Sequence, residues 1–222
     1  GLGCTVIRKP IPQFVNLFQE ADPGVESAFA DILDRFRPDV VHVNHLLYLS
    51  TGLPALAKTR GIPVVFTLHD YWVRCPRLTL LDHAERLCNG ATPLTCVACC
   101  RDLFTRYPVF PARHGARWRG RVTSLAKHLA STVVETPLAL ARMRRREREM
   151  RQLGSHVDAW IAPSRFLQDL LVGWGLPRAA VLFIPHGLDT ANLPRRVGPR
   201  TAARLRFGYL GTISRHKGVH VL

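Results

Sequence analysis

What the 222-residue sequence lacks narrows the class of protein it can encode. Acidic residues are scarce, with 16 Asp and Glu against 31 Lys and Arg, and aromatic residues make up only 8% of the chain. No stretch approaches the roughly 20 uninterrupted apolar residues that a membrane-spanning helix needs, and no charged-then-apolar signal segment opens the chain. Internal repeats and low-complexity tracts are also missing. We therefore expect a soluble, cytoplasmic, globular protein, and the 47% apolar content is enough for a real core.

The excess positive charge is concentrated in one part of the chain. Residues 101–151 contain thirteen Arg or Lys against four Asp or Glu, a large share of the formal net charge of +15. Such a segment attracts anionic partners, which include phospholipid headgroups, nucleic acid and phosphorylated substrates. The alternative is a solvated helix surface in an arginine-rich protein.

Apolar periodicity predicts an α/β fold. Residues 25–36 carry apolar side chains at helical spacing, which predicts an amphipathic helix that Arg37 and Pro38 end. Short β-branched runs then alternate with helical stretches, and this alternation is typical of βαβ units with a parallel sheet. The predicted strands cover residues 40–43, 64–68, 158–162 and 181–184, with helices at 50–60 and from 164 to about 174.

The same pass along the chain predicts its domain organisation. Residues 1–191 are expected to form a Rossmann-like domain, residues 192–204 a linker, and residues 205–222 the start of a second domain, opening with a strand at 206–210. Within the first domain lie a Cys-rich insertion (residues 74–107) and a basic helical region (residues 115–153). Because the chain begins at Gly1 and ends in what reads as the start of a helix, we expect a fragment truncated at both ends.

Small or polar residues follow every predicted strand. In an open parallel sheet, ligands bind beyond the carboxyl ends of the strands, so these positions are candidates for a site. His69 comes directly after a buried apolar strand and must be paired or functional there. Helix capping explains Ser164 well, and contact with a ligand at this position stays an open alternative. The residues at the strand ends are Asn44, His45, His69, Asp70, Ser164, His186, Gly187 and Gly211.

Five segments in order resemble the retaining glycosyltransferases of family 4. Each motif is weak alone, but together they cover the chain from about residue 25 to its end. They are PDVVHVNH at residues 38–45, TLHDYW at 67–72 with Cys75-Pro76, APSRF at 162–166, IPHGLD at 184–189, and GYLG at 208–211 with HKGV at 216–219.

The resemblance implies two Rossmann-like domains facing each other across a cleft. It implies transfer of a sugar (hexosyltransferase type, EC 2.4) from a nucleotide-diphosphate sugar to a glycan or lipid-linked acceptor, with retention and without a catalytic metal. Polysaccharide or lipid-linked glycan biosynthesis is the expected setting. Most of the donor pocket would lie beyond Leu222, so the fragment alone is expected to be inactive.

The resemblance also implies roles for individual residues. His69, with Asp70 beside it, lines the cleft near the transferring sugar, and Lys217 binds the donor diphosphate. Family members often carry an arginine after the glycine that matches Gly211, but this chain has Thr212, so Arg215 is the candidate second cation. The expected catalytic residues are His69 and Asp70, the donor-binding residues are Lys217, Arg215, Gly211, His186 and Gly187, and the acceptor-side residues are Asn44, His45 and Ser164.

Four cysteines follow the spacing C-x12-C-x7-C-x2-C, with Cys100 adjacent to the last. A terminal C-x2-C is a common zinc chelate, and four thiolates could hold this insertion together as a structural zinc site. Reduced, partly buried thiols are an equal alternative, and a disulfide is a third interpretation, disfavoured in the cytoplasm. The candidate zinc ligands are Cys75, Cys88, Cys96 and Cys99.

Two other interpretations of the basic segment remain open. A zinc-bearing nucleic-acid-binding module would explain the pI near 10.7. However, the arginine run at residues 142–151 is interrupted by Glu147 and Glu149 and lacks aromatic residues that stack on bases, so we expect no nucleic-acid partner. The second is peripheral contact with an anionic membrane at its cytoplasmic face. The apolar residues of this helix, among them Leu138, Ala141 and Met150, could equally pack on the domain.

Overall fold

A computed structural model describes residues 21–88, 90, 92–101, 124–188, 191 and 208–221, although the side chains of residues 124–135 and of Arg215 lie outside this description. The chain divides into two compact units, residues 1–184 and 185–222. The first unit contains the sheet and its helices. The second contains the candidate donor-binding residues, and each unit is described by itself.

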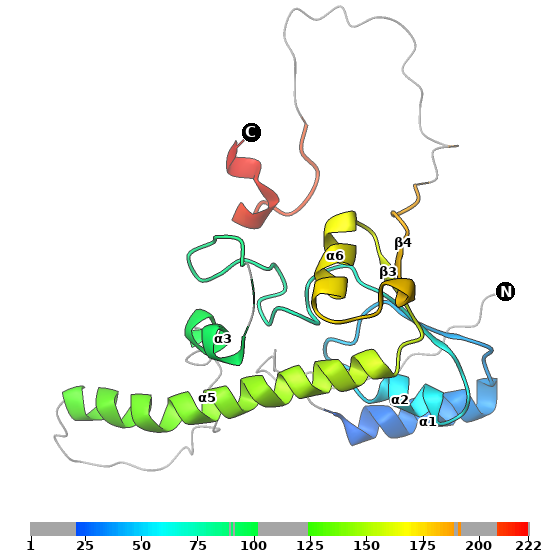
Figure 1. Cartoon of the computed structure of the whole chain (residues 1–222), viewed down its shortest axis with the longest axis horizontal. Coiled ribbons are helices and arrows are strands. Elements are labelled where there is room, and N and C mark those ends of the chain that lie inside the picture. The colour runs from blue at the N-terminus through cyan, green and yellow to red at the C-terminus, as the bar shows by residue number, and fades with distance from the viewer. Residues whose placement is uncertain are drawn as a thin grey trace, which may run out of the picture. The chain divides into compact units, whose positions relative to one another are not determined.

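The first unit is an α/β structure built on a four-stranded parallel sheet. The strands are β1 (Val41–Val43), β2 (Val64–Thr67), β3 (Ala159–Ala162) and β4 (Val181–Phe183), and they pair in the order β1-β2-β3-β4. Each connection contains helix or the Cys-rich insertion, as parallel pairing demands. This confirms the predicted Rossmann-like fold class. The α-helices of this unit are α1 (Pro23–Phe36), α2 (Leu53–Lys58), α3 (Pro93–Cys99), α5 (Ser124–Ser155) and α6 (Arg165–Gly173) (Figure 1).

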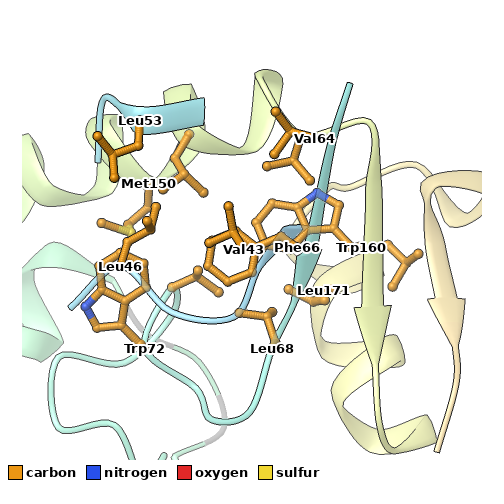
Figure 2. Close-up of a cluster of buried hydrophobic side chains, with 14 of the residues drawn as sticks. Val43, Leu46, Leu53, Val64, Phe66, Leu68, Trp72, Met150, Trp160 and Leu171 are labelled. Carbon is orange, nitrogen blue, oxygen red and sulfur yellow. The ribbon is translucent and has the colours of Figure 1, made fainter. Parts of the chain in front are cut away.

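The core follows from the strands being apolar on both faces. Val64 and Phe66 of β2 are fully buried, and the ring of Phe66 stacks on that of Trp160 in β3 with centroids 5.0 Å apart. Figure 2 shows Trp160 of β3 and Leu171, which belongs to α6, at one end of this core. Trp72, from the segment after β2, and Met150, which belongs to α5, lie at the other end. Burial of this kind stabilises the fold by about 25 cal/mol for each Å² of apolar surface.

Local sequence signals explain where the helices begin and end. The carboxylate of Asp22 caps α1 by accepting from the backbone N–H of Val25 over 3.0 Å, and Pro23 occupies the first turn. Arg37 ends the helix in the left-handed conformation at φ 47°, directly before Pro38. Helix α2 is shorter than the predicted 50–60 because its ends are turns, with Gly52 at the N-cap and the left-handed Gly61 (φ 71°) just beyond it.

Helix α5 confirms the predicted basic helical region from residue 124 onward, and residues 115–123 lie outside the described residues. Apart from Gly154, the buried residues in the described part of α5 fall on one stripe with alternating steps of three and four, so the helix packs on the domain and Met150 joins the main core. The stripe consists of Ala139, Met143, Arg146, Met150 and Leu153. In the described part of the chain no helix is long and apolar enough to cross a membrane.

The Cys-rich insertion packs against α5 mainly through α3. Thr92 caps α3 in a reciprocal capping box with Thr95, and Pro93 opens the helix. Before it, an antiparallel bridge between Leu81 and Leu87 closes a small loop. The insertion therefore has local structure of its own, as predicted, although it buries few large side chains.

The described part of the second unit is loop and 3₁₀ helix. The predicted strand at 206–210 is wrong for its described part, because residues 208–210 form no strand, and residues 206–207 lie outside the description. Leu210 is fully exposed, and a strand without a neighbouring strand has no partner for its backbone groups. Short 3₁₀ turns follow at η2 (Arg215–Lys217) and η3 (Val219–Val221). The predicted linker at 192–204 also lies outside the described residues.

Candidate functional site

The carboxyl ends of β1 and β2 bring four of the predicted site residues together. The two strands are adjacent and parallel, with Val43 paired to Phe66, so the residues that follow them meet at one edge of the sheet. Three side-chain hydrogen bonds cross between the strands, each joining residues 25 apart. These are His42 with Thr67 at 2.8 Å, Asn44 with His69 at 3.0 Å, and His45 with Asp70 at 3.0 Å.

The pair formed by His45 and Asp70 is fully hydrogen-bonded. Nδ1 of His45 accepts from the backbone N–H of Leu47 over 2.8 Å, so the neutral ring carries its proton on Nε2 and donates to Oδ2 of Asp70. The other carboxylate oxygen, Oδ1, accepts from the backbone N–H of Trp72 over 2.8 Å, which is an Asx turn. Both oxygens of Asp70 therefore help to fix the loop, and a site role for this 30% exposed carboxylate stays a prediction.

The second pair, Asn44 and His69, is the more exposed one. Both residues are solvent-exposed, whereas the side chains of His45 and Asp70 are only 32% and 30% exposed. Nε2 of His69 lies 3.0 Å from Oδ1 of Asn44, so the amide oxygen orients the imidazole by accepting from it. An oriented, accessible imidazole at the carboxyl edge of a parallel sheet can donate to or accept from a bound hydroxyl.

The buried side chain of Trp72 anchors the loop that follows β2. Its ring lies against that of His45, with centroids 5.3 Å apart, and its side chain is 1% exposed. Its carbonyl oxygen accepts a hydrogen bond from Nη2 of Arg146 on α5. The backbone of Trp72 is therefore held on both sides, by Asp70 at its N–H and by Arg146 at its carbonyl.

Arg146 is the residue that sequence reasoning missed. It belongs to an arginine run that the sequence assigned to a solvated or membrane-facing surface, yet it is only 5% exposed. Burial lowers its pKa to about 10, and the neighbouring thiols of Cys75 and Cys96 act in the opposite direction. The signal that could have revealed it is its position on the buried stripe, three residues after Met143 and four before Met150.

Ser164 has the capping role that the sequence allowed. It follows β3 and its Oγ accepts from the backbone N–H of Leu167 over 3.2 Å, which caps α6. The residue is exposed at this helix end. Next to it, the rings of Tyr71 and Phe166 meet edge to face with centroids 6.0 Å apart, which links the loop after β2 to α6.

The predicted donor-binding residues all lie in the second unit. Gly211 has φ +151°, a conformation that side-chain-bearing residues rarely adopt, and a Cβ there would meet Oη of Tyr209 at 3.0 Å. That hydroxyl donates to the carbonyl of Thr212 over 2.8 Å. Lys217 ends η2, with its backbone N–H bonded to the carbonyl of Ser214. His186 and Gly187 open the unit, and the side chain of Arg215 lies outside the described residues, so donor binding by these residues stays a prediction.

The five cysteines of the insertion are free thiols. Cys75 and Cys100 are buried, and Cys96, Cys99 and Cys100 pack together with Met143 of α5. Burial, together with Cys75, Cys88 and Cys99 nearby, raises the pKa of Cys96 to about 11. No group of three or more His, Cys, Asp or Glu in the described residues stands ready to hold a metal ion. Zinc at Cys75, Cys88, Cys96 and Cys99 stays a prediction that elemental analysis tests.

The arrangement of these parts defines the class of protein. A parallel α/β sheet with polar side chains gathered at the carboxyl ends of its strands is typical of Rossmann-like domains, which bind their ligands at that edge. The family model of the glycosyl transferase 4-like domain matches residues 1–187, and the chain belongs to this family. It is therefore a glycosyltransferase domain. No curated protein and no solved structure matches the chain.

Proposed function

We propose that this protein transfers a sugar from a nucleotide-diphosphate sugar to an acceptor, with retention of configuration at the anomeric carbon. The observation that supports the proposal best is the hydrogen-bonded set of Asn44, His45, His69 and Asp70 at the carboxyl edge of the sheet in a glycosyl transferase 4-like domain. Such an edge is where Rossmann-like domains bind their ligands. The exposed imidazole of His69 is the group that we assign to the reacting sugar.

The chemistry of sugar transfer fits this set of side chains. Negative charge grows on the departing diphosphate as the glycosidic bond breaks, and a fixed cation there stabilises the transition state more than the ground state. In the proposal Lys217 supplies that cation and Arg215 assists it. The departing phosphate itself takes the acceptor proton, so no nucleophilic side chain is needed. This agrees with Asp70, whose two carboxylate oxygens are both engaged in holding the loop.

The acceptor in the proposal is a growing polysaccharide or a lipid-linked glycan at the cytoplasmic face of a membrane. The exposed side of α5 supports this part, because Arg144, Arg148 and Arg151 lie there on the outer face of the helix. Arg151 also pairs with Glu147 over 3.2 Å, which reduces the net charge available to anionic lipid. Flotation with vesicles tests the contact. Binding that increases with the fraction of anionic lipid supports it, and binding that ignores lipid charge contradicts it.

Release of nucleoside diphosphate tests the central proposal. The protein from its complete reading frame is incubated with a panel of nucleotide sugars and acceptors, and wild type is compared with His69→Ala and Lys217→Ala. We expect both variants to lose most of the release, by about a hundredfold or more, since each removes a group that acts on the reacting centre. His83→Ala is the matched control, because His83 is an exposed histidine in the insertion. Full activity in both test variants would contradict the assigned site.

A further inference from the structure

A second site stands out on the side of the insertion, separate from the sheet edge. A pocket of ≈ 30 Å³, open to solvent, lies where the segment after Trp72, helix α3 and helix α5 meet the C-terminal end of α6. That volume exceeds the roughly 10–15 Å³ that one water molecule needs. The residues that matter for its chemistry are Arg74, Cys96, Arg146, Glu147 and Trp174.

Three of these residues carry buried N–H groups with no acceptor. Nε of Arg74, Nε of Arg146 and Nε1 of Trp174 are each buried and have no hydrogen-bond partner in the described part of the chain. A buried donor that is left unpaired costs about 1–3 kcal/mol, and more when it is charged. Three such donors on residues that line one pocket are therefore a reason to expect an acceptor there that the described residues do not provide.

The pocket also holds more positive than negative charge, with Arg74, Arg146 and the single carboxylate of Glu147 in its lining. Arg146 is only 5% exposed and Arg74 is half-buried, and neither forms an ion pair with a described residue. The guanidinium of Arg74 lies 5.6 Å from the ring centroid of Trp174, and that of Arg151 lies 5.8 Å from the same centroid. The carboxylate of Glu147 lies 3.2 Å from Arg151 and also attracts Arg74, so one carboxylate is shared among several guanidinium groups. Buried cations whose charge is only partly balanced are expensive to maintain.

We propose that this pocket binds a phosphate group, held by Arg74, Arg146 and the indole N–H of Trp174. A phosphate oxyanion accepts several hydrogen bonds at once and matches the fork of donors on a guanidinium. Trp174 in the lining supplies a third, neutral donor. The phosphate is either free inorganic phosphate or the phosphate of a larger ligand that reaches the pocket from solvent.

The phosphate site would act on the loop after β2, which carries His69 and Asp70, through the hydrogen bond between Arg146 and Trp72. Arg146 donates from Nη2 to the carbonyl of Trp72, and Trp72 in turn packs on His45 and donates to Asp70. A phosphate bound to Nε of Arg146 would hold this guanidinium in place while its other end holds Trp72. Phosphate binding would therefore make the loop around His69 and Asp70 more rigid. The proposal stands independently of the sugar-transfer reaction.

Direct binding measurements test it on the protein from the complete reading frame. Titration calorimetry with inorganic phosphate, against sodium chloride of equal ionic strength, should show saturable binding of one equivalent. Thermal denaturation under the same two conditions should show a higher melting temperature in phosphate. Arg74→Gln and Trp174→Phe each remove one donor, and Trp174→Phe keeps an aromatic ring under Arg74. We expect the affinity to fall about tenfold in Arg74→Gln and about threefold in Trp174→Phe.

The matched control is Arg144→Gln, which removes one arginine from the exposed side of the same helix. It should bind phosphate as wild type does, because its charge does not reach the pocket. Glycerol 3-phosphate separates the two sources. Tighter binding of the ester than of inorganic phosphate assigns the site to a phosphorylated ligand, and equal binding assigns it to free phosphate. Absence of saturable binding, or equal weakening in Arg144→Gln and Arg74→Gln, would overturn the proposal.

Discussion

His45 and Asp70 form a closed pair: Nε2 of His45 donates to Oδ2 of Asp70 over 3.0 Å, and the remaining ring nitrogen and carboxylate oxygen are bonded to the backbone of Leu47 and Trp72. Every polar atom of the pair therefore has a partner. Such a pair fixes the ends of β1 and β2 relative to each other. The neighbouring pair of Asn44 and His69 is more exposed to solvent than this pair.

Asp70→Asn should destabilise the fold. The side-chain amide of the new Asn can take two flipped orientations. In one its NH₂ group faces Nε2–H of His45, and in the other it faces the backbone N–H of Trp72, so one donor always meets another donor. We expect the free energy of unfolding to fall by about 1–3 kcal/mol, measured by urea denaturation at neutral pH. Asp39→Asn is the matched control, because Asp39 is an exposed carboxylate two residues before β1.

His69→Ala should behave in the opposite way. His69 is exposed, so removing its ring should change the free energy of unfolding by no more than about 0.5 kcal/mol while the sugar-transfer activity is lost. If instead Asp70→Asn kept wild-type stability and His69→Ala unfolded the protein, the structural role would belong to His69 and not to Asp70.

Ser164→Ala should cost stability through loss of the α6 cap. The hydroxyl of Ser164 accepts from the backbone N–H of Leu167, and removal of such a cap typically costs about 1 kcal/mol, which urea denaturation can measure. Ser164→Asp keeps a capping oxygen and should restore the stability. If Ser164 only caps the helix, the aspartate variant is also fully active. A stable but inactive Ser164→Asp protein would show that this position contacts the ligand as well.

The elements that have a clear hydrophobic pattern could be predicted from the sequence. For this reason the strands of the sheet were predicted correctly. Each strand is a short apolar run between turn residues, and each helix that packs on the sheet carries its own stripe, as in residues 25–36. The sequence also placed His69 and Asp70 at a strand end. It could not separate their roles, because the assignment depends on Leu47 and Trp72, whose backbone groups carry no sequence signal.

Arg146 shows a second limit of the sequence. An arginine among five others on one helix looks solvated, and only its position on the stripe of Met143 and Met150 indicates burial. The partner that makes burial tolerable is the carbonyl of Trp72, 74 residues earlier in the chain. The prediction of a strand at 206–210 was wrong over residues 208–210, its described part, for a related reason. An apolar run is a strand only where another strand pairs with it, and pairing is a property of the fold rather than of the run.

The cysteines of the insertion should react slowly in the folded protein. Burial and the neighbouring Cys75, Cys88 and Cys99 raise the pKa of Cys96 to about 11, and the thiolate is the form that reacts. We expect iodoacetamide at pH 8 to alkylate Cys96 about a hundredfold more slowly than in urea, measured by mass spectrometry of its peptide. Equal rates in both conditions would contradict this burial. Addition of a chelator separates the two open interpretations, because it accelerates labelling only where a metal protects the thiols.

Asp158 should make part of the stability depend on pH. Its Oδ1 accepts from Nζ of Lys58 over 2.6 Å and its Oδ2 from the backbone N–H of Val64 over 2.7 Å, and these bonds, that of Lys58 first, lower its pKa below the usual value of 3.8. A depressed folded-state pKa means that the unfolded chain binds the proton more readily. The contribution is therefore complete above the unfolded pKa and is lost as the pH falls through the folded pKa.

Asp158→Asn isolates this contribution. Its amide oxygen can still accept one of the two hydrogen bonds, but its charge is gone, so the stability difference from wild type should be on the order of 1 kcal/mol at pH 7. As the pH falls below about 4, the aspartate of the wild type becomes protonated and the difference should shrink toward zero. Urea denaturation at a series of pH values measures it. Asp169→Asn is the control, because its ion pair with Arg178 lies on the open surface. A difference between wild type and Asp158→Asn that stays constant with pH would show that Asp158 acts through packing rather than through its charge.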